Sequence, residues 1–323
     1  MKAHILHLQR LSTEDGPGIR TTIFFKGCPL RCVWCHNPES IESLSQLQWH
    51  SVRCIGCYSC LPVCPSFALS KSDQGGILID RHLCDACGVC VDACPAVALE
   101  LLGTDVEIKD LVYDLLKDKA YYLSSSGGVT ASGGEPTLQA DTVSMIFQEL
   151  RRSGIHTALD TCGYCSQENL SKILPFTDLV LYDLKSMDPA EHIQFTGRSN
   201  QHILENLLWI RDEIADQYPQ TKLWIRTPLI PGYTANEANL RSIGEFISRE
   251  LGSCLERWEL CAFNNLCQSK YERLDMPWSL VSTPLLAQPE LDILGEIAIA
   301  SVPDPGIVFV TGTARLPEKL SLS

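Results

Sequence analysis

The chain has 323 residues, 45% of them hydrophobic, and a formal net charge of −13. This length and hydrophobic content suit one large α/β domain, or one domain with a small added module. Because a strongly acidic surface repels phosphate backbones, a nucleic-acid partner is not expected. A protein partner or a small ligand is the better expectation.

Sixteen cysteines are many for an enzyme of this length. Residues 1–10 lack the apolar core and the small-residue cleavage site of a signal peptide. No apolar run reaches the roughly 18 residues that span a bilayer. We therefore expect a cytoplasmic protein with no membrane partner. In a reducing cytoplasm, clustered cysteines indicate metal or redox chemistry rather than disulfides.

The first chemical motif is a group of three cysteines, Cys28, Cys32 and Cys35. Residues 19–25 before it are β-branched and aromatic, which predicts a buried strand that leads into the cysteine loop. A structural zinc or an electron-carrying cluster normally takes four protein ligands. Three cysteines with no fourth close behind leave one metal position open, where a substrate can bind. This pattern indicates radical chemistry on S-adenosylmethionine.

Two further cysteine groups follow, each with the spacing C-x2-C-x2-C-x3-C-P. This is the spacing of bacterial ferredoxins, in which the fourth cysteine of each run binds the other cluster. The expected ligand sets of two 4Fe–4S clusters are Cys54, Cys57, Cys60 and Cys94, and Cys84, Cys87, Cys90 and Cys64. A pair of zinc sites is the alternative, although zinc sites usually use C-x2-C pairs separated by longer loops. The remaining cysteines are expected to be buried small hydrophobes: Cys162, Cys165, Cys254, Cys261 and Cys267.

Outside the cysteine-rich segment, strands and helices alternate along the chain. The expected strands are 128–131, 156–160, 178–183, 222–230 and 257–263, and the expected helices include 106–119, 138–153, 167–174 and 236–251. Such alternation predicts a parallel sheet, and six β/α units can be counted. The predicted fold class is α/β: a partial (β/α)6 TIM-like barrel, residues 1–44 and 104–323, with a ferredoxin-like module inserted at 45–103. No chemistry is recognised after about residue 276.

Polar motifs directly follow the expected strands. They are the cysteine trio, Gly133-Gly134-Glu135-Pro136, Asp160-Thr161, Asp183 with Lys185, Arg226, and Asn264-Asn265. Parallel β/α folds place their active sites at the carboxyl ends of the strands. We therefore expect these motifs to surround one site.

Three stretches together resemble a known family. They are Asp15-Gly16-Pro17-Gly18-Ile19-Arg20-Thr21, Gly27-Cys28-x3-Cys32-x2-Cys35-His36-Asn37-Pro38, and Ser132-Gly133-Gly134-Glu135-Pro136. Over about residues 12 to 270, the chain resembles the activating enzymes of glycyl radical enzymes, which are radical S-adenosylmethionine proteins. The two-cluster insertion is similar to that of activators serving glycerol or choline lyases, arylacetate decarboxylases, benzylsuccinate synthase and isethionate lyase.

The resemblance implies a mechanism. The cysteine trio would hold three irons of a 4Fe–4S cluster, and the fourth iron would bind the amino and carboxylate groups of S-adenosylmethionine. One electron would cleave this cofactor to methionine and a 5′-deoxyadenosyl radical, which removes a Cα hydrogen from the C-terminal glycyl loop of a partner glycyl radical enzyme. The ferredoxin-type spacing of the other two runs separately suggests that their clusters relay electrons from a flavodoxin- or ferredoxin-type donor to the cluster of the trio.

The resemblance also implies roles for site residues. Glycines 133 and 134 with Glu135 would meet the methionine amino end, and Asp15 would lie near the entering glycyl loop. Contacts to the cofactor are implied for Lys185, Arg226, Trp34, His36 and Asn264, the last standing where the pyruvate formate-lyase activator has a histidine. Asp160, Thr161 and Asp183 match positions that bind a monovalent cation in that activator, and helix N-capping is the alternative for them. Asp15 and Lys185 are also counted as candidate catalytic residues.

Other functions stay open at this point. They are a radical enzyme acting on another peptide or small molecule, an electron-transfer iron–sulfur protein, and a zinc-binding scaffold. The sequence does not specify which glycyl radical enzyme would be the partner, which reductant serves it, or the oligomeric state.

Overall fold

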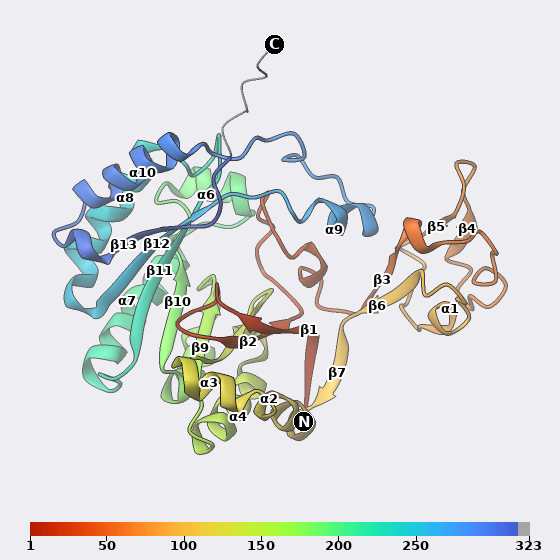
Figure 1. The fold of residues 1–323 in the computed structure, drawn as a ribbon, viewed down its shortest axis with the longest axis horizontal. Helices are drawn as coiled ribbons and strands as arrows, with labels where there is room; N and C mark the ends of the chain where they lie inside the picture. Colours follow the sequence, from red (N-terminus) through yellow and green to blue (C-terminus); the bar gives the residue numbers. More distant parts are fainter. Residues whose placement is uncertain (316–323) are drawn as a thin grey trace, which may run out of the picture.

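The computed structural model describes residues 1–315, and its central element is a nine-stranded sheet (Figure 1). The strand order is β13-β12-β11-β10-β9-β8-β2-β1-β7. Neighbouring strands from β2 through β8 to β13 run parallel, whereas β1 pairs antiparallel with β2 and with β7. The expected α/β fold with a large parallel sheet is confirmed.

The strands of this sheet are β1 (Lys2–Ser12), β2 (Arg20–Phe25), β7 (Thr104–Glu107), β8 (Gly128–Gly133), β9 (His156–Thr161), β10 (Leu179–Asp183), β11 (Lys222–Leu229), β12 (Leu255–Ala262) and β13 (Val308–Thr311). The helices are α1 (Val89–Asp92), α2 (Ile108–Leu116), α3 (Lys119–Ser125), α4 (Ala140–Arg152), α5 (Gln167–Ile173), α6 (Pro189–Thr196), α7 (Gln201–Asp216), α8 (Glu237–Phe246), α9 (Gln268–Arg273) and α10 (Gln288–Ala300).

The central strands are buried on both faces, which is why they read as continuous apolar runs in the sequence. All six residues of β2 are buried, as are the first five of β8. Helices supply the covering layer: α2, α4, α5, α7, α8 and α10 all contribute to one hydrophobic core with the sheet. Parallel sheets are stable only when both faces are covered in this way.

Several expected boundaries differ from the structure. The helix expected at 106–119 begins at Ile108, because Val106 pairs with Ala3 in the β1–β7 ladder. The helix expected at 236–251 is α-helical to Phe246 and continues as a π-helix at Ile247–Leu251. Neither β1 nor α9 was expected from the sequence.

Residues 45–103 form sheets of their own and lie to one side of the main sheet (Figure 1). β3 (Gln46–Trp49) pairs with β6 (Leu99–Leu102), and β4 (Leu69–Lys71) pairs with β5 (Ile77–Ile79). The cysteine runs and apolar residues such as Leu47 and Ile77 make a separate small core. Of the range expected for the larger domain, residues 316–323 lie outside the described residues. No helix within residues 1–315 has the length and apolar character needed to cross a membrane.

Candidate active site

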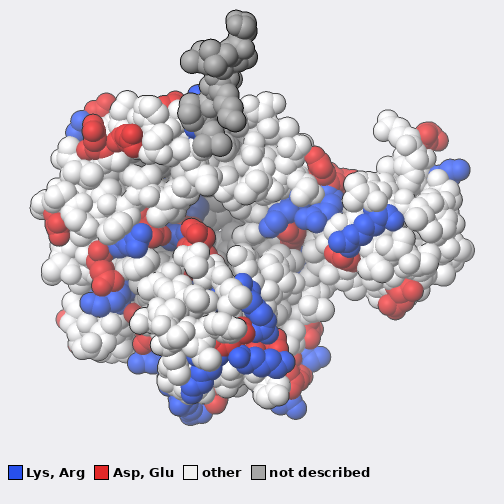
Figure 2. All heavy atoms as spheres, in the orientation of Figure 1, with Lys and Arg blue, Asp and Glu red and all other residues white. Residues whose placement is uncertain are grey.

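A cavity of about 430 Å³ opens at the carboxyl ends of the parallel strands. Figure 2 shows a hollow in the middle of this face, with acidic and basic side chains beside it. The cavity is lined by Asp15, Cys28, Cys32, Trp34, Cys35, His36, Gly133, Gly134, Asp160, Thr161, Asp183, Lys185 and Arg226, among others. The expectation that the polar motifs meet at one edge of the sheet therefore holds for most of them.

Backbone hydrogen bonds hold the cysteine loop at both of its ends. Gly27 N donates to Ser40 O (2.8 Å) and Cys28 N donates to Ile41 O (3.0 Å), while Val33 N donates to Phe195 O (3.0 Å). All three thiols reach the cavity. Burial raises the pKa of Cys32 to about 12 and raises that of Cys35 further, so neither thiolate is favoured without a positive partner.

A segment far along the chain also holds this loop. The Tyr271 hydroxyl donates to Cys35 O (2.8 Å), and Trp278 Nε1 donates to Val33 O (3.1 Å). The two rings stack at a centroid distance of 5.2 Å. Lys270 donates to Asn37 Oδ1 and forms an ion pair with Glu39. This role could not be predicted from the sequence, because no local pattern shows that residues 270–278 pack against residues 33–39.

Gly133 and Gly134 are placed by close backbone contact with the cysteine loop. Gly134 N donates to Phe25 O, and Glu135 N donates to Gly27 O (2.7 Å). A Cβ at position 134 would lie 2.1 Å from Gly27 O, so only glycine fits there. The two glycines thus bring bare backbone to the cavity wall.

Glu135 differs from the sequence-based expectation. Its side chain is 0% exposed and does not line the cavity. The carboxylate accepts from Thr137 N, Thr137 Oγ1, Thr161 Oγ1 and Cys162 N, at 2.6 to 3.1 Å. The expectation that it receives the cofactor ammonium is therefore corrected: this carboxylate ties the ends of β8 and β9 together.

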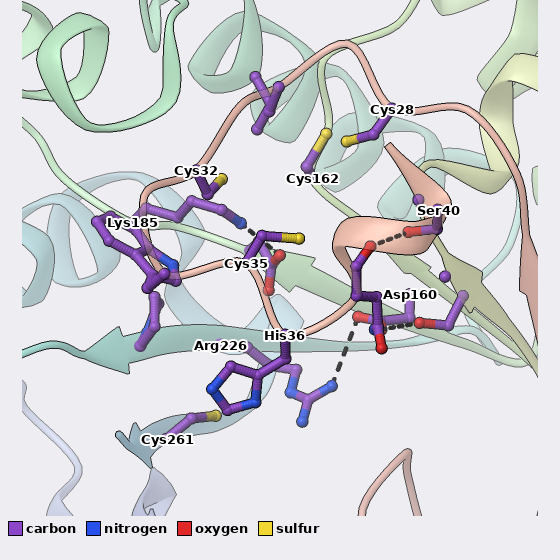
Figure 3. Close-up of a pocket in the computed structure, with 18 of the residues that line it drawn as sticks. Cys28, Cys32, Cys35, His36, Ser40, Asp160, Cys162, Lys185, Arg226 and Cys261 are labelled. Carbon is purple, nitrogen blue, oxygen red and sulfur yellow. Dashed lines mark hydrogen bonds and ion pairs between the residues drawn. The ribbon is translucent and has the colours of Figure 1, made fainter. Parts of the chain in front are cut away.

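Opposite charges alternate along one wall of the cavity. Arg226 pairs with Asp160 at 3.5 Å, Lys185 pairs with Asp183, and Ser132 Oγ donates to Asp160 (2.6 Å), as Figure 3 partly shows. Burial raises the pKa of Asp160 to about 7, against the opposing effect of Arg226. Burial lowers the pKa of Lys185, but Asp183 and nearby thiols outweigh it and keep the ammonium charged. The N-capping alternative fails for Asp160, Thr161 and Asp183, because the caps of α5 and α6 are Ser166 and Asp188.

The stretch from Asp15 to Ile19 turns the chain into β2 and brings Asp15 to the cavity. The Arg20 side chain is fully buried and donates to Thr130 Oγ1 (2.7 Å) and Pro17 O (3.2 Å). Asp15 itself accepts from Ser12 Oγ (2.7 Å) and Thr22 Oγ1 (2.6 Å). Gly18 has φ +68°, which favours glycine. The motif is thus largely structural, with one carboxylate facing the cavity.

His36 and Trp34 line the cavity as expected, whereas Asn264 does not. The His36 ring donates from Nε2 to the backbone oxygen of Asn264 (2.9 Å). The Asn264 side chain instead accepts from Leu266 N, within its own loop. The expectation of a side-chain contact from Asn264 to the nucleoside is therefore corrected, and Ala262 and Phe263 line that part of the wall.

Two cysteines reach the cavity unexpectedly. Cys162 and Cys261 both line it, and the Cys162 sulfur points toward that of Cys28 (Figure 3). A hydrogen bond from Cys162 lowers the pKa of Cys28 and raises that of Cys162. Spacing alone could not find this pair, because the contact arises from strand order and not from neighbouring residues in sequence.

The two ferredoxin-type runs surround two small cavities. One is lined by Cys54, Cys57, Cys60 and Cys94, and the other by Cys64, Cys84, Cys87 and Cys90. The fourth cysteine of each run thus lies with the first three of the other. Within residues 1–315, no three His, Cys, Asp or Glu side chains converge closely enough to hold a single metal ion. These two sets are the ligand groups that the ferredoxin-type spacing predicts.

Comparisons with known proteins agree with this geometry. Residues 14–204 match the family described as 4Fe-4S single cluster domain. The chain is 40% identical over 273 residues to the isethionate sulfite-lyase activating enzyme of Nitratidesulfovibrio vulgaris, a match covering 83% of this chain and 86% of that protein. It is 39% identical over 277 residues to the trans-4-hydroxy-L-proline dehydratase activating enzyme of Clostridioides difficile, covering 85% and 88%.

The chain belongs to the glycyl radical enzyme activating enzymes. The family resemblance carried by the three sequence motifs is thereby confirmed. Among solved structures, Streptococcus suis SuiB aligns with a TM-score of 0.50 and 13% identity, covering 64% of this chain and 44% of that one. At this identity the likeness shows a shared fold and nothing more about this activating enzyme.

Proposed function

We propose that this activating enzyme reductively cleaves S-adenosylmethionine and removes a Cα hydrogen from a glycine in a partner glycyl radical enzyme. The observation that carries the proposal is the meeting of three thiols, Cys28, Cys32 and Cys35, with paired charges in one cavity. A loop with three cysteines leaves one cluster iron free for a ligand. The partial-barrel architecture, with residues 45–103 as an inserted module, is part of the same proposal.

The charges of the cavity suit a sulfonium-bearing amino acid. Lys185 and Arg226 are cations that can pair with a carboxylate, while Asp160 and Asp183 are anions that can receive an ammonium or face a sulfonium. Arg226 Nε lies 3.4 Å from Glu259 Oε2, so a second carboxylate also holds this guanidinium at the cavity wall. Bound S-adenosylmethionine supplies the radical chemistry, and the chain's own residues orient it and exclude water.

We propose that Asp160, Thr161 and Asp183 bind the amino-acid end of S-adenosylmethionine. A monovalent cation beside the cofactor carboxylate would bind to the same three residues. Lys185 and Arg226 already neutralise the two carboxylates. A cation would therefore have to share or displace these pairs. We propose that Lys185 turns from Asp183 to the cofactor carboxylate on binding.

Asp15 is proposed to face the glycyl loop of the partner. Its carboxylate is held by two hydroxyl groups, from Ser12 and Thr22, and lines the cavity together with Glu14. Both residues lie in the connection between β1 and β2 and line the cavity. A substrate glycine entering there would meet a fixed acidic edge.

The two four-cysteine sites are proposed to hold 4Fe–4S clusters, for a total of three with that of the cysteine trio. They would pass electrons inward from a protein donor of the flavodoxin or ferredoxin class. The alternative of a zinc scaffold is disfavoured by the C-x2-C-x2-C-x3-C-P spacing of both runs, because zinc sites usually use C-x2-C pairs separated by longer loops. An electron-transfer protein without its own chemistry would not need the charged cavity next to the cysteine trio.

The experiment that tests the proposed activity is isotope transfer. A candidate partner enzyme is prepared with deuterium at glycine Cα, and the reduced activating enzyme is supplied with S-adenosylmethionine. The proposal predicts one deuterium in the 5′-deoxyadenosine that is released. Release of this product without deuterium, alongside an unmodified partner, would instead favour a radical enzyme acting on another substrate.

A further inference from the structure

We propose that the two four-cysteine sites act in series and in one fixed order. The inner site is Cys64, Cys84, Cys87 and Cys90, and the outer site is Cys54, Cys57, Cys60 and Cys94. The inner site is the direct electron source for the loop of Cys28, Cys32 and Cys35. This order rests on the proposed electron-relay function and specifies which of two similar sites stands next to the active site.

The direction of the β3–β6 ribbon defines which end of the module is near the main sheet. Gln46 pairs with Leu102 at one end and Trp49 with Leu99 at the other. The Gln46 end joins the main sheet, because Lys26 at the end of β2 donates from Nζ to Gln46 Oε1 (3.1 Å). Lys26 stands two residues before Cys28. The Trp49 end therefore points away from the active site.

The two cysteine sites lie at opposite ends of this ribbon. The inner site is lined by Leu47, near the end that joins the main sheet. Its Gly88 packs on Leu101, whose Cδ1 would lie 2.9 Å from an added Cβ. The outer site is lined by Trp49, Ala98 and Leu99, at the far end. Strand geometry thus places the inner site closer to the active site.

A second contact joins the inner site to the main domain. Arg81 lies three residues before Cys84, and Cys84 N donates to Asp80 O. The Arg81 guanidinium donates to Leu47 O (2.8 Å) inside the module and to Asp275 Oδ2 (2.9 Å) outside it. Figure 2 shows a run of basic side chains on the surface between the hollow and the module.

The segment that receives Arg81 is the one that holds the active-site loop. We call residues 268–278 the strut. Asp275 and the Arg273 carbonyl accept from Arg81. On either side of them in the chain, Tyr271 donates to Cys35 O and Trp278 donates to Val33 O. Hydrogen bonds through Arg81 and the strut thus connect the inner-site segment to the active-site loop, whereas no hydrogen bond from the outer-site cysteine segments to the main domain is found among the described residues.

The electron balance is simple. A low-potential one-electron protein donor of the flavodoxin class is oxidised once as the outer site is reduced. The outer site is reoxidised when the inner site takes the electron, and the inner site when the active-site loop takes it. No bond is made or broken until S-adenosylmethionine receives the electron.

The chain offers a matched pair of variants, Cys57→Ala and Cys87→Ala. Each is the second cysteine of its run, and both are solvent-exposed, so the surrounding fold is disturbed alike. Each variant should lose the resonance signal of one 4Fe–4S cluster and keep the signals of the other two. The two remaining signals can be told apart, because only that of the active-site loop changes when S-adenosylmethionine is added. Anaerobic mixing with photoreduced flavodoxin, followed by rapid freezing and paramagnetic resonance, shows which of the two is reduced.

The order predicts different results for the two variants. In Cys87→Ala, the outer signal appears and the S-adenosylmethionine-responsive signal does not. In Cys57→Ala, neither remaining signal appears on the wild-type timescale. The opposite pattern would reverse the order, and reduction of the responsive centre at wild-type speed in either variant would show that the sites do not act in series.

A small reductant separates failure of the order from failure of the proposed activity. Titanium(III) citrate reaches the active-site centre directly, so both variants should still release 5′-deoxyadenosine with it. If the wild-type enzyme releases none, the proposed activity fails whatever the order.

A second pair of variants leaves every cysteine in place. Arg81→Ala removes the contact with the strut, and Arg53→Ala removes an arginine beside the outer site that binds Glu100. We expect Arg81→Ala to slow reduction of the responsive centre several-fold while the inner signal still appears at wild-type speed. Arg53→Ala should leave the rate of electron transfer from the inner site to the active-site loop unchanged. Equal effects of Arg81→Ala and Arg53→Ala on that rate would contradict the assigned route.

Discussion

Single residues at the cavity wall are constrained by how closely two backbones approach. Gly134 has no positive φ, so the demand for glycine there is purely one of space. Its missing Cβ lets the Gly27 carbonyl, one residue before Cys28, come into contact. A small change at this position therefore acts on the cysteine loop itself.

Replacing Gly134 by alanine should push the cysteine loop away from β8. The added Cβ would lie 2.1 Å from Gly27 O and 2.8 Å from Ser40 O. Overpacking of this kind costs about 1–3 kcal/mol. We expect a lower melting temperature and weaker binding of S-adenosylmethionine, measured anaerobically by calorimetry. Gly306→Ala, whose Cβ would meet only the Asp304 side chain, is the control and should behave as wild type.

His156 is a half-buried histidine that the active site does not use. Its Nδ1 lies 3.4 Å from the Arg20 guanidinium. Burial, and to a lesser degree the positive charge of Arg20, lower the pKa of His156 from 6.5 to about 4, whereas Asp178 acts in the opposite direction. Between these pH values the unfolded chain binds more protons than the folded one. Stability contributed by the neutral ring is thus present above pH 6.5 and lost as pH falls toward 4.

His156→Gln should therefore flatten the acid limb of the stability profile. Urea unfolding of the anaerobic protein at several pH values between 7 and 4.5 measures the effect. Wild type should lose more free energy of unfolding over this range than the variant does. Parallel profiles would mean that the ring is not held neutral.

At the scale of elements, the strut shows how distant segments stabilise the active-site loop. Tyr271 and Trp278 donate to backbone oxygens on either side of Trp34, and Lys270 reaches Asn37. The contacts are few and specific. Their loss should loosen the loop without unfolding the sheet.

Tyr271→Phe should make the active-site centre more labile. The variant keeps the stacked ring and removes one hydrogen bond, worth about 1 kcal/mol. A chelator should remove iron from the cysteine trio faster than in wild type. The loss is measured as the decay of the S-adenosylmethionine-responsive resonance signal. Tyr113→Phe, at an exposed position on α2, should leave the rate unchanged. A rate equal to wild type in Tyr271→Phe would contradict the holding role.

The elements that the sequence predicted share one physical property. Strands β8 to β12 are buried on both faces, so their apolar runs stand out, and the polar residues that end them mark the active-site edge. β1 was missed because much of it is exposed, which weakens its apolar pattern. α9 was missed because its importance comes from packing against a loop more than 230 residues away in the chain.

The same distinction explains the site residues. Cysteine spacing is local, so the three cysteine groups could be read directly from the sequence. Cys162 could not, because its contact with Cys28 depends on which strands are neighbours. Glu135 and Asn264 were assigned by their positions in motifs, but side-chain direction is decided by local hydrogen bonds, and both turn away from the cavity.

For the molecule as a whole, the main sheet carries the cavity and the cysteine-rich segment stands beside it (Figure 1). The β3–β6 ribbon and the strut are the two connections between them. In the proposed function, a partner would enter at the mouth of the cavity and electrons would enter from the side. That function requires the cysteine trio to leave one cluster iron free to bind S-adenosylmethionine.

The most direct test of that dependence is electron–nuclear double resonance on the reduced, anaerobically purified protein with S-adenosylmethionine labelled with ¹⁵N at its amino group. The account predicts a strong nitrogen coupling to the cluster held by Cys28, Cys32 and Cys35, showing the amino group bound to iron. A reduced-state spectrum that is unchanged by S-adenosylmethionine, with no nitrogen coupling, would contradict it.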